Sequence, residues 1–125
     1  MYSRALIVRE PYATRIVEGG KTWELRKAHT KVRGVVGIVA QGSGAVIGTA
    51  RITDSLAVPV DALKTLDAAL QHCAPSEFVD KYFKGRATAC VWTLDDAVKF
   101  AEPRRYVAKR GQMVWVLFPA DGPSE

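Results

Sequence analysis

Residues 20–26 have the sequence Gly-Lys-Thr-Trp-Glu-Leu-Arg, and this segment is the most informative part of the chain. The alternation of polar and apolar side chains predicts a β-strand over Lys21–Lys27, with Trp23 and Leu25 on one face. The opposite face would then hold the polar side chains Thr22, Glu24 and Arg26. A strand with one apolar and one polar face is typical of the edge of a core or the wall of a cleft.

Lys21, Glu24 and Arg26 are the main candidate site residues. Glu24 and Arg26 would lie about 7 Å apart on one face of the strand, so their side chains can meet. Lys21 precedes them at a turn and could reach the same cleft. Together these groups could bind a nucleobase edge or a phosphate, or polarise a water or a carbonyl. The alternative is a structural Glu–Arg ion pair that closes one end of the fold.

A short strand and a helix are expected before this segment. Ala5–Val8 is an apolar run bounded by charged residues and predicts a buried strand. Pro11 would open the helix, because its missing N–H would be unbonded at the first helical position. Gly19-Gly20 would end it, since glycine accepts the left-handed backbone of a helix stop. The apolar face of this helix would comprise Tyr12, Ala13, Ile16 and Val17.

The rest of the chain predicts a hairpin, two helices and two further strands. The loop 28–33 leads to strands at 35–40 and 45–53, joined by the turn Gly42-Ser43-Gly44. Asp61 would cap a helix with an apolar stripe, and a second helix would cover 78–83. Later strands are expected at 87–94, extending as far as Phe100, and at 113–118. This order predicts an α+β fold, a small closed or nearly closed β-barrel with flanking helices. The stripe comprises Leu63, Leu66, Ala69 and Leu70.

The composition fits one domain in a reducing compartment. With 125 residues, 48% of them hydrophobic, the chain predicts a single core over residues 1–119 and a flexible tail at 120–125. Cys73 and Cys90 show no redox or metal spacing, and Cys90 lies in an apolar run that predicts burial. No apolar stretch approaches the ~20 residues of a membrane span and no signal segment is evident, so we expect a cytoplasmic protein.

The formal charge of +5 favours a polyanionic partner. The basic residues form three clusters, and an aromatic lies within the third, as in sites for single-stranded RNA. The alternative is ordinary solvated loops. The predicted contacts with nucleic acid are Lys27, Lys31, Arg33, Arg104, Arg105, Tyr106, Lys109 and Arg110. The remaining cluster comprises Lys81, Lys84 and Arg86.

No metal or cofactor is expected. His29 and His72 lack any metal-ligand spacing with the cysteines, so a zinc site is not predicted. The chain also has no phosphate-binding glycine loop and no dinucleotide-binding motif.

The segment 20–26 resembles the signature of the ASCH domain family, in which a glycine and a lysine precede an alternating glutamate and arginine. Three further pieces resemble later strands of the family, in the same order. The resemblance implies a PUA-like β-barrel with a cleft beside the first helix and a role in binding RNA. The three pieces are 34–38 (Gly-Val-Val-Gly-Ile), 47–52 (Ile-Gly-Thr-Ala-Arg-Ile) and 111–115 (Gly-Gln-Met-Val-Trp).

The resemblance also indicates which residues line the cleft. The segment that begins the first helix lines it in the family, and Tyr12 could stack on a base, a contact worth ~1–3 kcal/mol. The alternative for Tyr12 is a core aromatic at a helix start. The predicted ligand-binding residues are Arg9, Tyr12, Lys21, Thr22, Trp23, Glu24 and Arg26.

Two functions are compatible with these observations. The first is a binding module for RNA or a nucleotide, acting as a monomer or weak dimer. The second is a metal-independent hydrolase with Lys21, Glu24 and Arg26 as catalytic residues: a ribonuclease, or a nucleoside amidohydrolase acting on N4-acetylcytidine, both of which the family contains. The amidohydrolase type has a threonine nucleophile three residues after the lysine, where this chain has Glu24, and a carboxylate cannot act as an activated hydroxyl.

Overall fold

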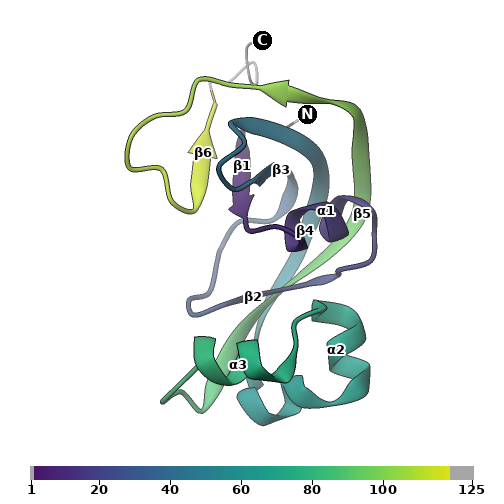
Figure 1. Ribbon diagram of the computed structural model, residues 1–125, viewed down its shortest axis with the longest axis vertical. Helices are drawn as coiled ribbons and strands as arrows, with labels where there is room; N and C mark the ends of the chain where they lie inside the picture. The colour runs from purple at the N-terminus through teal and green to yellow at the C-terminus, as the bar shows by residue number, and fades with distance from the viewer. Residues whose placement is uncertain (1, 119–125) are drawn as a thin grey trace.

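A computed structural model describes residues 2–118, which form an α+β fold around one mixed sheet (Figure 1). The six strands of this part of the chain follow the spatial order β2-β5-β4-β3-β1-β6. β1 pairs in parallel with β3, and the other neighbours are antiparallel. The strands are β1 (Arg4–Val8), β2 (Trp23–Arg26), β3 (Gly34–Ala40), β4 (Ala45–Pro59), β5 (Thr88–Arg105) and β6 (Trp115–Leu117).

The expected hairpin is confirmed, but two strands are much longer than predicted. β4 and β5 have 15 and 18 residues and pair along most of their length. Their register shifts at three places, between Val46 and Gly48, between Thr49 and Arg51, and between Ile52 and Asp54. Each irregularity moves side chains off the simple alternation from which strands are predicted, and it bends the strand. The predicted ends at residues 53 and 100 were therefore too early.

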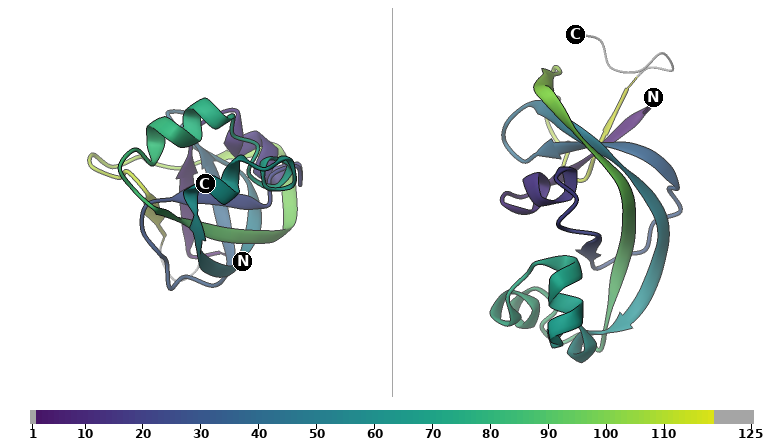
Figure 2. Two further views of the ribbon diagram at one scale, coloured as in Figure 1. Left: turned by 90° about the horizontal axis from the view of Figure 1, so that it is seen from below. Right: turned by 90° about the vertical axis from the view of Figure 1, so that its right-hand side faces the viewer.

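The long strands curve strongly, and the helices lie on the concave side of the sheet (Figure 2). Among the described residues β2 and β6 remain the two edges of the sheet, so the barrel is open. The prediction of a small barrel with flanking helices is confirmed in this approximate form.

The helix α1 (Tyr12–Val17) packs against the upper part of the sheet (Figure 1). Its buried residues Ala13, Ile16 and Val17 belong to the largest core cluster, as their spacing predicted. Gly48 on β4 permits this packing, because a Cβ atom there would lie 2.7 Å from Val17 Cγ1 and would collide with the carbonyl oxygen of Val98.

The lower end of the sheet is covered by a 3₁₀ turn, η1 (Val60–Lys64), and by the helices α2 (Leu66–His72) and α3 (Ser76–Tyr82). The prediction of Asp61 as a helix cap was wrong, because that residue lies inside η1. Thr65 caps α2 instead, where its side chain accepts a hydrogen bond from the Ala68 backbone N–H at 3.2 Å. The predicted apolar stripe is therefore divided between two elements, with Leu63 in η1 and the other three residues in α2.

The side chains of α2 that are buried differ from those predicted. Leu66 and Leu70 are 77% and 67% exposed, whereas Ala68 and His72 face the core. Leu63 of η1 is buried in a separate core cluster. The same cluster contains Val79 of α3 and Phe83, which follows that helix. A second core therefore lies below the first, and the segment containing β2 passes between them (Figure 1).

Neither cysteine forms a disulfide, and Cys90 is buried as expected. The predicted tail at 120–125 lies outside the described residues. No helix within residues 2–118 combines the length and the apolar character needed to cross a membrane.

Candidate functional site

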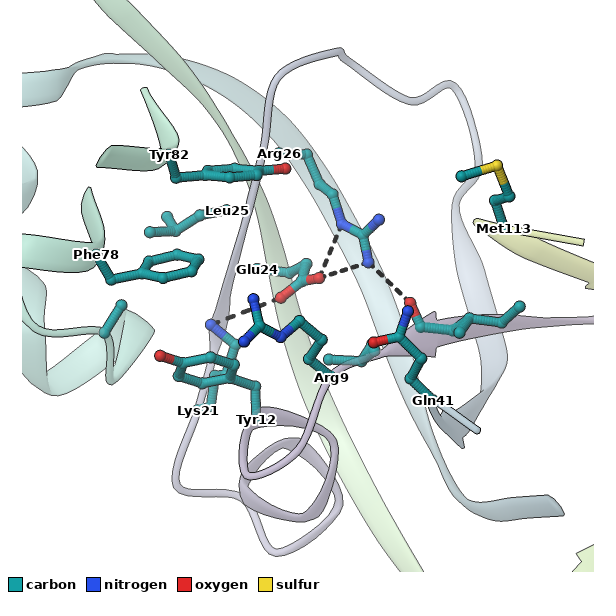
Figure 3. Close-up of a pocket in the computed structure, with 13 residues that line it drawn as sticks. Arg9, Tyr12, Lys21, Glu24, Leu25, Arg26, Gln41, Phe78, Tyr82 and Met113 are labelled. Atoms are coloured by element: carbon teal, nitrogen blue, oxygen red, sulfur yellow. Dashed lines mark hydrogen bonds and ion pairs between the residues drawn. The ribbon is translucent and has the colours of Figure 1, made fainter. Parts of the chain in front are cut away.

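A cavity of about 190 Å³ lies between α1, β2 and α3 (Figure 3). Its floor is polar and comes from the segment 20–26, whereas aromatic rings of α1 and α3 form one side. The lining residues are Ile7, Val8, Arg9, Tyr12, Lys21, Glu24, Leu25, Arg26, Gln41, Ala74, Phe78, Tyr82 and Met113.

The Glu24 carboxylate lies at the centre of the cavity and is only 6% exposed. Arg26 donates to its Oε2 from Nε at 2.8 Å and also pairs with it through Nη2 at 2.7 Å (Figure 3). The same guanidinium donates to the Ile7 carbonyl at 3.0 Å and lies 5.4 Å from the centre of the Trp92 ring. These contacts hold Arg26 and the carboxylate in one orientation.

Lys21 is buried behind Glu24 and is 3% exposed. Its ammonium donates to the carbonyl oxygens of Trp23 and His72, both at 2.7 Å, and lies 3.6 Å from Glu24 Oε1. Burial lowers the pKa of Lys21 below its ordinary value, and the neighbouring Glu24 carboxylate opposes that shift. Each of the three N–H groups of the ammonium thus has a nearby acceptor, and Lys21 serves to position Glu24.

His72 is buried against the same segment, at the end of α2. Its Nδ1 accepts a hydrogen bond from the Ala74 backbone N–H at 2.9 Å, so the proton of the neutral ring is on Nε2, which donates to the Leu63 carbonyl at 2.6 Å. Burial lowers the pKa of His72, and the nearby Lys21 charge lowers it further. The neutral ring therefore holds the backbone of residue 72 in place, and the carbonyl of that residue accepts the hydrogen bond from Lys21.

Three aromatic rings form the apolar side of the cavity. Tyr12 and Phe78 have ring centroids 5.9 Å apart, and Phe78 and Tyr82 are stacked at 5.4 Å with an angle of 16° between their planes. Lys21 lies 5.1 Å from the Tyr12 ring centre, and Lys27 lies 4.7 Å from that of Tyr82. An aromatic wall facing a fixed carboxylate suits a flat ligand that carries N–H groups on one edge.

Comparisons with known proteins identify the family of the chain and its fold. The family model described as the ASCH domain matches residues 6–104. The chain belongs to the ASCH domain family. No curated protein matches the sequence.

Solved structures of the ASCH protein from Zymomonas mobilis have the same fold. One of them has a TM-score of 0.78 at 18% identity, over 94% of this chain and 88% of that chain. Two crystal structures of mutant proteins give TM-scores of 0.77 at 18% identity and 0.76 at 17% identity. They too cover 94% of this chain, with 91% and 89% of their own lengths.

The ASCH fold brings five of the seven predicted ligand-binding residues to the cavity: Arg9, Tyr12, Lys21, Glu24 and Arg26. The other two, Thr22 and Trp23, do not line it. The Thr22 hydroxyl donates to the side-chain oxygen of Gln71, and Trp23 packs on the lower core.

Four cavity residues with chemically useful side chains were not predicted: Gln41, Phe78, Tyr82 and Met113. Phe78 and Tyr82 are four residues apart on α3, which places them on one helix face, and this spacing was available in the sequence. Gln41 and Met113 lie in loops, where no periodicity indicates direction.

The predicted basic residues lie in two separate regions of the domain. Lys27, Lys31 and Arg33 are exposed after β2, and Arg33 pairs with Asp54 at 3.5 Å. Arg104 and Arg105 end β5 opposite Val46 and Ala45. Tyr106, Lys109 and Arg110 follow in the loop towards β6, near a second cavity described below.

Within residues 2–118 no group of three or more His, Cys, Asp or Glu side chains is arranged to hold a metal ion.

Proposed function

We propose that this ASCH domain binds single-stranded RNA or a nucleotide by accepting one base in the cavity beside α1. The observation that carries the proposal is the buried Glu24 carboxylate, held by Arg26 and Lys21 and facing an aromatic wall. A fixed carboxylate accepts hydrogen bonds from the N–H groups of a base edge, and the rings supply stacking surface.

The cations around the cavity suit the backbone of such a ligand. Arg9 lines the mouth, is exposed, and has no side-chain partner among the residues that the structure describes. Lys27 lies over the outer ring of the aromatic wall, that of Tyr82. Both are suited to contact phosphates on either side of the bound base.

Binding is favoured over hydrolysis by the contacts of the candidate catalytic groups. The Lys21 ammonium is directed at two carbonyls and a carboxylate, so its N–H groups point at these acceptors and not at a ligand in the cavity. Glu24 occupies the position at which the amidohydrolase type has its nucleophile. The Thr22 hydroxyl is bonded to Gln71 and lies outside the cavity lining.

Anisotropy of a fluorescent mixed-sequence RNA octamer tests the proposal. We expect Glu24→Gln to weaken binding about 10- to 100-fold, since hydrogen bonds to charged groups contribute about 1.5–3 kcal/mol. Arg9→Ala should weaken it with no change in stability. The matched control is Asp67→Asn, an exposed carboxylate outside the cavity. Equal affinity of Glu24→Gln, Arg9→Ala and the control would contradict the proposal.

The same preparation tests the hydrolase alternative. Incubation with RNA or with N4-acetylcytidine, followed by mass spectrometry, should leave both substrates unchanged. Product formation that disappears in Glu24→Gln would make the domain an enzyme.

A further inference from the structure

We propose that a second cavity binds the nucleotide next to the one whose base enters the first, so that the ligand of this domain is an oligonucleotide and not a free nucleoside. The inference rests on the proposed function. The second cavity, of about 390 Å³, is bordered by the turn 42–44 and by the loop between β5 and β6.

The two cavities share part of their lining. Ile7, Gln41 and Met113 line both of them, and Figure 3 shows Gln41 and Met113 on the side of the first cavity away from the aromatic wall. The first cavity, of about 190 Å³, is smaller than the ~300–1,000 Å³ of sites that enclose a whole small ligand. A nucleotide whose base fills it must therefore extend beyond it, and the second cavity begins at the residues that the two linings share.

The second cavity is suited to a phosphate and its sugar. Lys109 lines it, is exposed, and has no ion-pair partner among residues 2–118. Its backbone N–H donates a hydrogen bond to Gln112 Oε1 at 3.0 Å, and the Gln112 backbone N–H donates to the Lys109 carbonyl at 3.4 Å. This pair of bonds folds the loop so that Lys109 borders the cavity. No acidic side chain lines it.

The opposite wall of the second cavity is formed by the glycine turn 42–44 and by Tyr106. The Tyr106 N–H donates to the Gly44 carbonyl at 3.2 Å, which joins the loop to the glycine turn. Gly42 and Gly44 have φ values of +82° and +67°, and a Cβ atom on either would meet nothing within 4 Å. Ligand atoms can therefore approach the turn closely. Arg104 and Arg105 end the adjoining strand, which adds positive charge beside this wall.

Competition against the fluorescent RNA octamer tests the inference. The competitors are an equimolar mixture of the four nucleoside 5′-monophosphates and the corresponding mixture of 5′-phosphorylated dinucleotides. We expect the dinucleotides to bind about tenfold more tightly, because the second residue adds stacking and a phosphate contact.

Substitutions in the loop between β5 and β6 test whether the second cavity supplies the additional affinity for dinucleotides. Lys109→Ala and Met113→Glu should each reduce the advantage of the dinucleotides to about twofold or less, and Lys109→Ala should lower the salt slope of octamer binding by about 0.7. The matched control is Arg15→Ala, which removes an exposed cation of α1 that lines neither cavity.

The outcomes separate the two proposals. Mononucleotides that bind as tightly as dinucleotides would overturn the second cavity while leaving the first intact. An unchanged dinucleotide advantage in both loop variants would overturn it as well. Absence of all binding would overturn the proposed function, and with it this inference.

Discussion

The Lys21 ammonium donates a hydrogen bond of 2.7 Å to the carbonyl oxygen of His72, a residue 51 positions further along the chain. This bond joins the polar floor of the cavity to the end of α2. It also places a buried positive charge 3.6 Å from Glu24 Oε1. Lys21 therefore connects the segment 20–26 to the end of α2 and orients the Glu24 carboxylate.

Removing that charge should destabilise the fold. Lys21→Met leaves Glu24 without one of its two cations and leaves two buried carbonyls without a donor, and we expect a loss of about 3–5 kcal/mol in the free energy of unfolding. Urea denaturation measures it. Lys84→Met, at an exposed position, should change stability by less than about 0.5 kcal/mol. Equal stability of the two variants would show that the Lys21 contacts contribute nothing.

The free energy of unfolding should decrease at acidic pH because of His72. Burial lowers the pKa of His72 in the folded state, so the unfolded chain binds the proton more readily. The contribution of His72 to stability is therefore fully present above the ordinary pKa of 6.5 and decreases as pH falls below that value. Protonation would also remove the acceptor of the Ala74 N–H. Urea midpoints at pH 7.5 and 5.0 should differ less in His72→Asn than in the parent. The control His29→Ala, at an exposed site, should retain the parental difference.

The aromatic wall should contribute directly to RNA affinity. Tyr82→Leu removes one ring from the wall, and we expect binding of the RNA octamer to weaken about 5- to 100-fold, the range of base–aromatic stacking. Leu70→Ala removes an exposed apolar side chain of α2 outside the cavity and should leave affinity unchanged. If Tyr82→Leu binds as tightly as the control, Tyr82 does not contact the ligand.

A side chain at residue 48 should lower the stability of the fold. Gly48→Ala would force Val17 and the Val98 backbone apart, and overpacking of this kind costs about 1–3 kcal/mol. Gly20→Ala is the matched control, because its Cβ atom would lie 3.7 Å from the Arg15 carbonyl oxygen, an ordinary contact. Thermal unfolding of both variants measures the difference. A loss no larger at residue 48 than at residue 20 would show that α1 can shift at little cost.

Local sequence patterns were enough to predict the α+β class, the hairpin around residues 42–44 and the two faces of β2. Each depends on side-chain alternation or on turn chemistry over a few residues. Leu25 is buried on the predicted apolar face, and Glu24 and Arg26 meet on the polar face. The predictions failed where neighbouring elements decide the outcome, as at Thr65, which caps α2 in place of Asp61.

The sequence by itself determined the family, the order of most elements and the polar centre of the site, because these are encoded by contiguous residues. Only the tertiary structure decided what surrounds that centre. Phe78 and Tyr82 reach the cavity because α3 packs against the end of a bent sheet, and Gln41 and Met113 reach it from loops of distant strands. Such contacts join residues far apart in the chain, and their positions depend on strand curvature and helix packing, which no local periodicity encodes.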